Sequence, residues 1–593
     1  MIGFIGNFTS HPILSPEGRG SQPPSPLREE GSGVRVNQPS EQTTTLPAPL
    51  RPPPWAILIL LVLLTGLAKT LLASLPRLIR WDEPDYVFMG RNFWLGKGLL
   101  NAGVPDLHSA PLLAVLSGPV NLLTNNPEAG TAAVFVICGA LLPAPIYLLG
   151  RDLYGRRAGL AAAFMAATIP SLLAAFLYWG SLTEPPYLLF LATALALAWR
   201  AISRNSIRYA AGAGVGFSLA YLARPEGVTY IAWFVGILLV ASLIRSRPLR
   251  LASLAPGFLA AAVATAAFLV TASPYIIYLH NHTGHWMLSG KIEITIQIGT
   301  AILANDYAQY DRVVSSLDDK GEIMWFSPRR FGPGLLQTIA ADPTYYLWRI
   351  RRNAFLAARA LLDAYYLPIW LIALVVYGWL AKPWDRTRFG REAFLLLGPA
   401  PLLSFTLFHI EDRFLAPMLL FAALWSGHGL VLLMEWLEKT WAQVWPHRAP
   451  GLAARFCTIA IPTLAVLLLS VLTTSGLVQR GISSFNVGEK EAGLWLKTYP
   501  VPGGVMSRNG AIPLYANRDW SPFPHAPLDE ALAYGRKRGA RFLVIDSWEV
   551  EVLRPFLSAL AHPAEEPPPA GLRFLQSFPS QGGRVTYVWE MVK

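Results

Sequence analysis

The sequence predicts a polytopic α-helical membrane protein with about eleven transmembrane helices and a small C-terminal α/β domain outside the membrane. Hydrophobic residues make up 53% of the 593 residues and charged residues only 15%, whereas a soluble globular protein carries roughly 25% charged residues. The apolar residues gather in blocks, and about 20 such residues can cross a bilayer as a helix. After the last block, segments of helix type and strand type alternate, which is typical of a compact α/β unit.

Eleven apolar blocks are the candidate transmembrane helices. They lie near residues 55–75, 131–150, 158–179, 185–201, 209–223, 227–244, 252–278, 360–381, 393–409, 414–434 and 457–477. A further apolar piece, 111–123, is too short to span. We expect it to be re-entrant or interfacial.

Basic residues fall in the loops on one side of these blocks. The loops contain Arg151, Arg156, Arg157, Arg200, Arg204, Arg208, Arg245, Arg247, Arg250, Lys382, Arg386, Arg388, Arg391, Lys439, Arg448 and Arg455. The short opposite loops hold little beyond Arg224 and Arg413. Because basic loops stay in the cytoplasm, this alternation predicts a multi-pass protein with a cytoplasmic N-terminus and an extracytoplasmic C-terminus. The basic loops also account for the net charge of +12. Nucleic-acid binding is not expected, because the sequence has no basic stretch interleaved with aromatic residues.

The chain divides into three predicted parts. Residues 1–53 are rich in Pro, Ser, Gly and Thr and lack the apolar segment of a signal peptide, which predicts a disordered cytoplasmic leader. Residues 54–480 form the membrane domain, with outer loops at 77–130 and 280–355. Residues 481–593 form the extracytoplasmic α/β domain.

Within that outer domain, the periodicity of apolar residues predicts individual elements. The predicted helices are 489–499 and 529–538, and the predicted strands are 504–507, 541–546 and 584–590.

An acidic pair, Asp82 and Glu83, follows the first span directly. At the level of the lipid headgroups a carboxylate is partly desolvated, which increases its basicity. Such a carboxylate suits a general base that acts on a substrate delivered from the membrane. The alternative is a surface loop whose charges only end the helix.

Three further charged clusters stand between spans at the same outer edge. Glu184 lies between two apolar blocks, where an ionisable residue is costly and indicates function. Arg224 and Glu226 offer a cation and a carboxylate together, and Arg413 ends the segment His-Ile-Glu-Asp-Arg. Each cluster alone could be a helix cap or a local ion pair. Together they predict an outer-face site for a phosphate-bearing lipid, since its headgroup needs cationic or metal partners.

No phosphate-binding loop of the form Gly-x-x-x-x-Gly-Lys-Ser/Thr occurs, and no strand-linked Gly-x-Gly-x-x-Gly. A cytosolic nucleotide sugar is therefore not the expected donor.

These features resemble the GT-C glycosyltransferases, specifically the branch of protein mannosyltransferases and aminoarabinose transferases (families 39 and 83). The resemblance rests on Asp82-Glu83, Tyr86, Asn92, Gly96, Gly98, His108, Pro111, Thr183-Glu184-Pro185 and Arg224-Pro225-Glu226-Gly227. Each motif is short. Their order and spacing relative to the spans, over residues 55–430, make the match specific.

The resemblance implies an inverting transfer of a sugar from a polyisoprenyl-phosphate donor to a hydroxyl acceptor on the outer face of the cell inner (plasma) membrane. The acceptor would be a protein, a lipid or a polysaccharide. The catalytic residues implied are Asp82 as general base, Glu83 in support and Glu184 at the family's second acidic position. The residues expected to bind substrate are Tyr86, Asn92, His108, Arg224, Glu226 and Arg413, with the two arginines as candidates for contacts to the donor phosphate. Members of the family differ in metal use, so a divalent metal is compatible with the site, although no histidine stands at a recognised ligand spacing.

Two departures from the family pattern leave the substrate preference open. Pro84 and Asp85 follow the acidic pair where relatives commonly have small or basic residues, and the His108 motif reads His-Ser-Ala-Pro rather than His-x-Pro-Pro.

The long outer loop 280–355 contains acidic, aromatic and basic residues and is expected to be a lid on the acceptor side, with interfacial helices.

The main alternative function is a transporter or flippase for a lipid-linked sugar. Such a protein is typically built from paired repeats whose broken helices meet near the midplane. The sequence has no evident internal repeat, and its charges gather at one edge instead.

Overall fold

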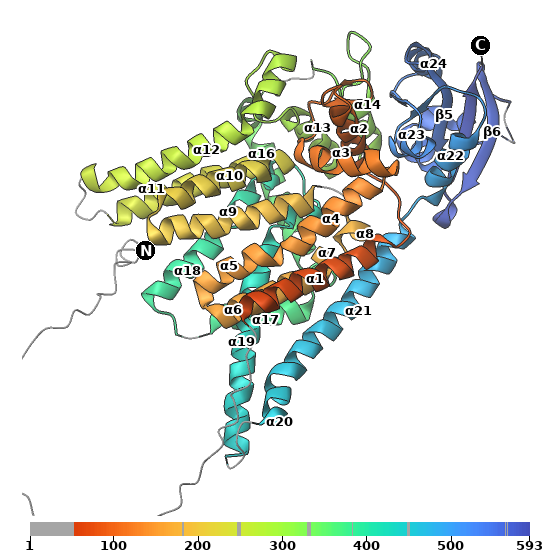
Figure 1. Ribbon diagram of the computed structural model, residues 1–593. Helices are drawn as coiled ribbons and strands as arrows, with labels where there is room; N and C mark the ends of the chain where they lie inside the picture. Colours follow the sequence, from red (N-terminus) through yellow and green to blue (C-terminus); the bar gives the residue numbers. More distant parts are fainter. Residues whose placement is uncertain are drawn as a thin grey trace, which may run out of the picture.

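The computed structural model describes residues 53–180, 183–245, 251–328, 334–381, 383–446, 451–563, 565 and 567–592. The predicted leader lies almost entirely outside these residues, as do Arg247, Arg250, Lys382 and Arg448 of the basic loops. The described chain forms a long helical bundle with a mixed α/β domain at one end (Figure 1).

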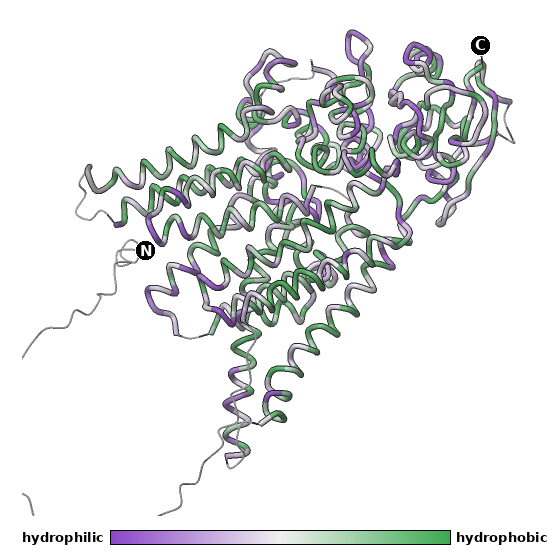
Figure 2. The backbone as a smooth tube through the Cα atoms, viewed as in Figure 1, coloured by the Kyte–Doolittle hydropathy of each residue, from purple (hydrophilic) through white to green (hydrophobic). Residues whose placement is uncertain are grey.

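Apolar helices build the bundle, and in the described residues seven helical segments are long and apolar enough to cross a membrane. They are α1 (Pro54–Ala73), α4 with α5 (Ala129–Leu141 and Pro143–Tyr154), α9 (Glu184–Arg204), α11 (Gly227–Arg245), α12 (Leu251–Thr283), α19 (Met418–Val444), and α20 with α21 (Leu452–Arg455 and Ile461–Ser483), joined by the π-helix η3 (Phe456–Ala460). Figure 2 shows that hydrophobic residues predominate in these helices, whereas the end of α19 far from the C-terminal domain includes hydrophilic residues.

The other four predicted blocks are also helical, but they are shorter or interrupted. The clearest interruption follows Ile169, whose ψ of 120° is extended, because Pro170 disfavours a helical conformation in the residue before it. The elements concerned are α6 (Arg156–Thr168), α7 (Pro170–Leu173), α8 (Ala175–Tyr178), α10 (Ile207–Ala223), α17 (Ile369–Leu380), α18 (Arg386–Leu397) and the 3₁₀ helix η1 (Ala400–Leu407).

Shorter elements form a cap on the bundle, next to the C-terminal domain (Figure 1). They include α2 (Glu83–Trp94), the hairpin of β1 (Leu100–Asn101) and β2 (Val104–Pro105), α3 (Leu112–Thr124), α13 (Ile292–Leu303) and α14 (Tyr307–Ser315). The segment predicted to be too short to span is α3. The outer loop 280–355 is largely helical, since α15 (Leu335–Ala341) and most of α16 (Pro343–Leu361) also belong to it.

The C-terminal domain is a five-stranded mixed sheet in the order β4-β3-β5-β7-β6. Its elements are α22 (Val487–Thr498), β3 (Gly504–Ser507), α23 (Ala511–Ala516), β4 (Trp520–Pro522), α24 (Leu528–Lys537), β5 (Ala540–Asp546), η4 (Glu549–Leu553), η5 (Pro555–Leu560), β6 (Leu572–Pro579), η6 (Gln581–Gly583) and β7 (Val585–Met591). The five elements predicted from periodicity are confirmed, whereas β4, β6 and α23 were not predicted. Successive strand residues point to opposite faces, so Leu543 and Trp589 pack in one core and Phe542 and Val588 in another.

This domain is fixed to the cap by polar contacts as well as by packing. Lys490 of α22 forms an ion pair with Glu128 at 2.7 Å, and the Tyr515 hydroxyl donates to the same carboxylate at 2.6 Å. The Tyr515 oxygen also accepts from the backbone N–H of Ile79 at 2.8 Å. The segment that leads from α1 to α2 is therefore held against the C-terminal domain.

The described basic loops lie at the other end of the bundle. The turns after α5 and α9 and the end of α11, which carry Arg151, Arg204 and Arg245, point away from the C-terminal domain (Figure 1). This arrangement agrees with the predicted grouping of basic residues on one side of the bundle.

Candidate functional site

Charged residues from four separate segments meet at the cap end of the bundle. We call them the site cluster: Asp82, Glu184, Arg224, Glu226, Glu411 and Arg413. They come from the N-terminus of α2, the N-terminus of α9, the turn between α10 and α11, and the region of the 3₁₀ helix η2 (Asp412–Leu415). The ring of Phe414 lies between the two arginines, with their guanidinium carbons 5.1 Å (Arg224) and 5.4 Å (Arg413) from its centroid.

Asp82 occupies the N-cap position of α2. The preceding residue, Trp81, is exposed and has a φ of 56°, which is unusual for a bulky residue. This turn presents Asp82 to the solvent, since 38% of its side chain is exposed. Its nearest cation is Arg413, at 3.7 Å between the Asp82 Oδ2 and the guanidinium. The carboxylate of Asp82 is thus accessible to a substrate.

Arg413 joins Asp82 to Glu411, with which it forms an ion pair at 2.6 Å. Burial disfavours the charge of Arg413, but Glu411 and Asp82 outweigh that effect and raise its pKa. Burial alone would raise the pKa of Glu411, but Arg413 and His409 lower it below the usual range. Arg413 therefore remains a cation beside two carboxylates.

Arg224 is more deeply buried and lies between Glu184, its closest partner, and Glu226, at 3.4 Å. Burial disfavours its charge, but Glu226 and Glu184 outweigh that effect and raise the pKa of Arg224. Burial would raise the pKa of Glu226, yet Arg224 and Lys291 lower it to about 2. Tyr86 of α2 is buried close to this group, and burial, with the charge of Asp82, raises its pKa well above the usual value.

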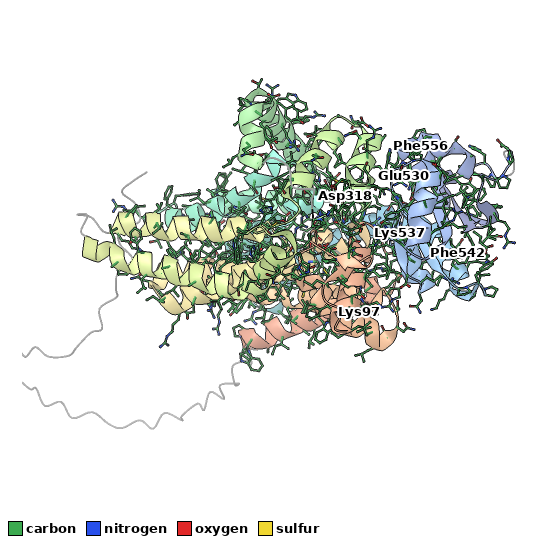
Figure 3. All side chains as sticks on the ribbon, turned by 90° about the horizontal axis from the view of Figure 1, so that it is seen from above. Lys97, Asp318, Glu530, Lys537, Phe542 and Phe556 are labelled. Atoms are coloured by element: carbon green, nitrogen blue, oxygen red, sulfur yellow. The ribbon has the colours of Figure 1, made fainter. Side chains whose placement is uncertain are left out.

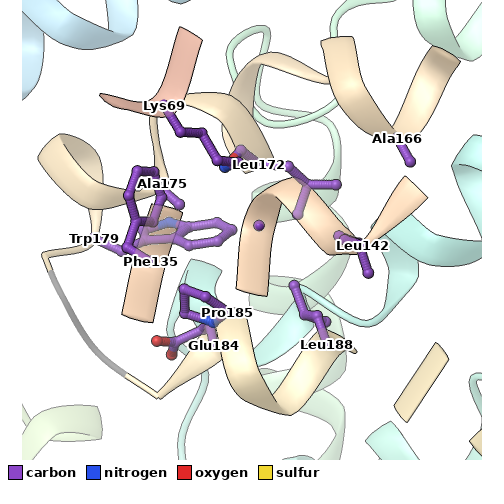
Figure 4. Close-up of a pocket in the computed structure, with 11 residues that line it drawn as sticks. Lys69, Phe135, Leu142, Ala166, Leu172, Ala175, Trp179, Glu184, Pro185 and Leu188 are labelled. Atoms are coloured by element: carbon purple, nitrogen blue, oxygen red, sulfur yellow. The ribbon is translucent and has the colours of Figure 1, made fainter. Parts of the chain in front are cut away.

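Glu184 also lines a narrow cavity of about 20 Å³ that extends into the bundle (Figure 4). Lys69 of α1 lines the same cavity, donates to the carbonyl of Leu172 at 2.7 Å and lies over the Phe135 ring at 4.2 Å. An ionisable side chain in a membrane span is costly unless it has partners. Lys69 thus places an amino group, with a carbonyl and an aromatic ring as its partners, in the cavity that Glu184 also lines.

Glu83 lies outside the site cluster, although it adjoins Asp82 in sequence. Its side chain is fully buried, forms an ion pair with Arg77 and accepts from the Thr131 hydroxyl at 2.6 Å. Burial raises its pKa, and Arg77 opposes that shift. The contacts of Glu83 tie α2 to α4 and to the segment before α2.

Asn92 and His108, two further predicted substrate-binding residues, contact the β1–β2 hairpin and the outer loop. Asn92 is near the other end of the 12-residue α2 and donates to the carbonyl of Leu100 at 2.9 Å. His108 is buried with its ring 3.5 Å from that of Trp325, next to Asp106, which accepts from its backbone N–H at 2.8 Å. In the described part of the chain, no three His, Cys, Asp or Glu side chains gather as a metal site.

Two residues that were not predicted as site residues face the site from α14 and the C-terminal domain. Tyr310 is close enough to Asp82 and Glu411 for their charges to raise its pKa, after the larger effect of burial. The guanidinium carbon of Arg508 lies 5.8 Å from the Tyr310 ring centroid. The sequence held one signal for Arg508, because it directly follows the predicted strand 504–507.

Asp311, next to Tyr310, is the centre of a second charged group, which we call the Asp311 cluster. Its buried carboxylate accepts from Arg508, His525 and Arg554, each at 2.8 Å. Burial would raise the pKa of Asp311, but these three partners lower it below the usual range. Figure 3 shows Asp318 of the same loop beside the C-terminal domain, where Glu322 pairs with Arg538 at 3.1 Å. The outer loop is thus held by the C-terminal domain next to the site.

Residues 108–278 match the family described as dolichyl-phosphate-mannose-protein mannosyltransferase. The structure is similar to that of ArnT from Cupriavidus metallidurans bound to undecaprenyl phosphate, with a TM-score of 0.52 and 12% identity, over 90% of this chain and 98% of that one. The chain has the GT-C fold.

A second solved structure has weaker similarity to this chain. It is the archaeal oligosaccharyltransferase AglB from Archaeoglobus fulgidus, with a TM-score of 0.48 and 14% identity, over 83% of this chain and 70% of that one. No curated protein matches the chain by sequence. The family match and the fold agree with a membrane glycosyltransferase.

Proposed function

We propose that this protein transfers a sugar from a polyisoprenyl-phosphate donor to a hydroxyl acceptor at the outer face of a cell inner membrane, with inversion and with Asp82 as the general base. The observation that carries the proposal is the position of Asp82. It is the more accessible carboxylate of the acidic pair, and it lies 3.7 Å from Arg413 at the end of an apolar bundle. The ArnT structure with undecaprenyl phosphate supports the class of donor.

The chemistry needs one proton acceptor and one stabilised leaving group. Asp82 takes the proton of the acceptor hydroxyl as its oxygen attacks the anomeric carbon of the sugar. The bond between that carbon and the phosphate oxygen breaks, and the lipid phosphate leaves with the electron pair. Attack from the face opposite the phosphate inverts the anomeric configuration.

Of the two arginines, Arg413 is the better partner for the leaving phosphate. Its side chain is 16% exposed and reaches Asp82, whereas Arg224 is 7% exposed and lies between two glutamates. Arg224 positions Glu184 and Glu226, and it adds positive electrostatic potential to the site from a more buried position. A cation aimed at developing phosphate charge is among the largest contributions to catalysis.

The direct test supplies radiolabelled polyprenyl-phosphate sugars to membranes that contain the chain and identifies the labelled product. We expect Asp82→Asn to lose transfer by about 10²–10⁴-fold, the usual contribution of a general base, with unchanged insertion into the membrane. The matched control is Asp306→Asn, which changes an exposed N-cap carboxylate of α14 to a residue that caps equally well. Full activity of Asp82→Asn would remove the assignment of the base.

Two other results would overturn the function itself. Labelled product formed only from nucleotide sugars would exclude the lipid-phosphate donor. Movement of the intact labelled lipid across the membrane, with no sugar transferred, would indicate a flippase.

A further inference from the structure

A second cavity lies at the other end of the helices that build the site. Its volume is about 250 Å³, and its lining includes Trp199 and Ile202 of α9, Trp233 and Gly236 of α11, and Phe394 of α18. α9 begins at Glu184 and has 21 residues, so its two ends are roughly 30 Å apart. This crevice is therefore separate from the site cluster.

The crevice is apolar and opens on the outside of the bundle. Phe394 forms its aromatic wall between Trp199 and Trp233, at centroid distances of 5.2 and 5.4 Å. Val240 and Leu397 also line it and are 53% and 52% exposed. Since α9 and α11 are membrane-spanning candidates, this outer surface faces hydrocarbon, and the natural occupant is a hydrocarbon chain.

The rim of the crevice is positively charged. Arg245, the last residue of α11, lines it and donates to the carbonyl of Ile202 at 2.7 Å. Arg204 ends α9 just after Ser203, which also lines the crevice. Basic residues at the end of a span attract anionic headgroups. Within the crevice, the buried indole N–H of Trp233 has no protein acceptor and is available to an ester oxygen.

We propose that this crevice binds an acyl chain of an anionic phospholipid from the leaflet opposite the site, with the lipid phosphate at Arg245. An apolar crevice with a cationic rim matches an amphiphile with an anionic head. A polar soluble ligand would make no apolar contact with the aromatic wall, and a zwitterionic lipid would offer Arg245 no net charge. The lipid would hold α9, α11 and α18 together at the end of the bundle where the basic loops lie.

The proposal can be tested without any assay of activity. The purified full-length chain is titrated in detergent with phosphatidylglycerol or phosphatidylcholine, and bound lipid is counted by native mass spectrometry. We expect roughly tenfold tighter binding of phosphatidylglycerol, the order of one charge-assisted contact. Arg245→Gln should abolish this preference, whereas Arg208→Gln, at an exposed arginine outside the crevice lining, should retain it.

A second pair of variants tests the cavity. Gly236→Leu should remove tight binding of both lipids, because no atom lies within 4 Å of a Cβ added at Gly236 and the new side chain would fill the space. The control, Ala232→Leu, introduces the same side chain at an exposed position of α11 outside the crevice lining. Equal binding in Gly236→Leu and Ala232→Leu would overturn the proposal. So would equal affinity for the two lipids, or displacement of phosphatidylglycerol by an equimolar neutral polyprenol.

Discussion

The site cluster and the Asp311 cluster are built from the same kinds of residue but differ in exposure. In the site cluster, Asp82 and Glu411 keep 38% and 40% of their side chains exposed. In the Asp311 cluster the carboxylate is fully buried, and three basic side chains satisfy it. Tyr310 stands between the two groups, next to Asp311 in sequence and near Asp82 in space.

This difference separates a structural carboxylate from one that is available for chemistry. A buried carboxylate with all its partners holds two parts of a protein together, and loss of one partner leaves an uncompensated charge. A partly exposed carboxylate that has one distant cation contributes little to stability. We therefore expect changes in the Asp311 cluster to affect folding first, and changes at Asp82 and Arg413 to affect activity first.

The largest expected effect is that of Asp311→Asn. The change leaves Arg508 and Arg554 without their anion, which should lower the free energy of unfolding by about 3–5 kcal/mol. Thermal unfolding of the detergent-solubilised chain, with proteolysis of the outer loop, measures the loss. Asp306→Asn on the same helix is the control and should change stability by less than about 0.5 kcal/mol. Equal stability of the two variants would contradict the structural role of Asp311.

The second prediction concerns Glu489, a buried carboxylate of the C-terminal domain that forms no ion pair with the residues that the structure describes. Asn486 and Asn509 donate to it at 3.1 and 2.9 Å, but burial and the nearby Asp546 raise its pKa to about 7 from 4.5. The folded chain then binds this proton more tightly than the unfolded chain, so stability decreases as pH rises from about 4.5 to about 7. The shift corresponds to about 3 kcal/mol at most.

Thermal unfolding between pH 5 and pH 8 measures this dependence. Glu489→Gln cannot titrate, so the difference between the variant and the wild-type chain should change with pH in this range. If the stability of the variant and of the wild-type chain depended on pH in the same way, Glu489 would not be the group that binds the proton.

The third prediction is that Arg413→Gln lowers kcat/KM for sugar transfer about 100-fold, because a cation near the leaving phosphate is lost. The free energy of unfolding should change by less than about 1 kcal/mol, since the carboxylates of Asp82 and Glu411 are partly exposed and can be hydrated. Arg480→Gln breaks another exposed pair, with Asp363 at 3.9 Å, and should leave transfer unchanged. A large loss of stability in Arg413→Gln with normal activity would reverse the roles of the two clusters.

The smallest expected effect is that of Tyr310→Phe. If the Tyr310 hydroxyl assists the substrate beside Asp82, its loss should lower kcat/KM by about tenfold or less, the value of one hydrogen bond. Tyr307→Phe, at a residue of α14 that is 44% exposed, is the matched control. Equal activity of the two variants would limit Tyr310 to a packing role.

Much of the architecture could be predicted from local sequence patterns. All eleven apolar blocks are wholly or largely helical, and the five predicted elements of the C-terminal domain are confirmed. The strands that were not predicted, β4 and β6, have weaker patterns. β4 has only three residues, and the inward and outward positions of β6 are interrupted where its register with β7 shifts.

Part of the candidate site could be predicted in the same way. Glu184, Arg224 and Arg413 were expected at one outer edge, and the structure brings them together with Asp82. Asn92 and His108 were also expected to bind substrate. The structure places Asn92 against Leu100 and His108 against Trp325, and their part in binding stays a prediction. The position of a residue relative to a span sets its depth, whereas lateral proximity depends on how the helices pack.

The sequence by itself determined where the chain is apolar, where its outer regions begin, and that an acidic pair follows the first span. It did so because hydrophobicity and helix period are properties of neighbouring residues. Only the tertiary structure decided that Asp82 is accessible and Glu83 is buried against Arg77 and Thr131. Successive residues at the start of a helix point about 100° apart, so two adjacent carboxylates face different surroundings, and those surroundings come from distant parts of the chain.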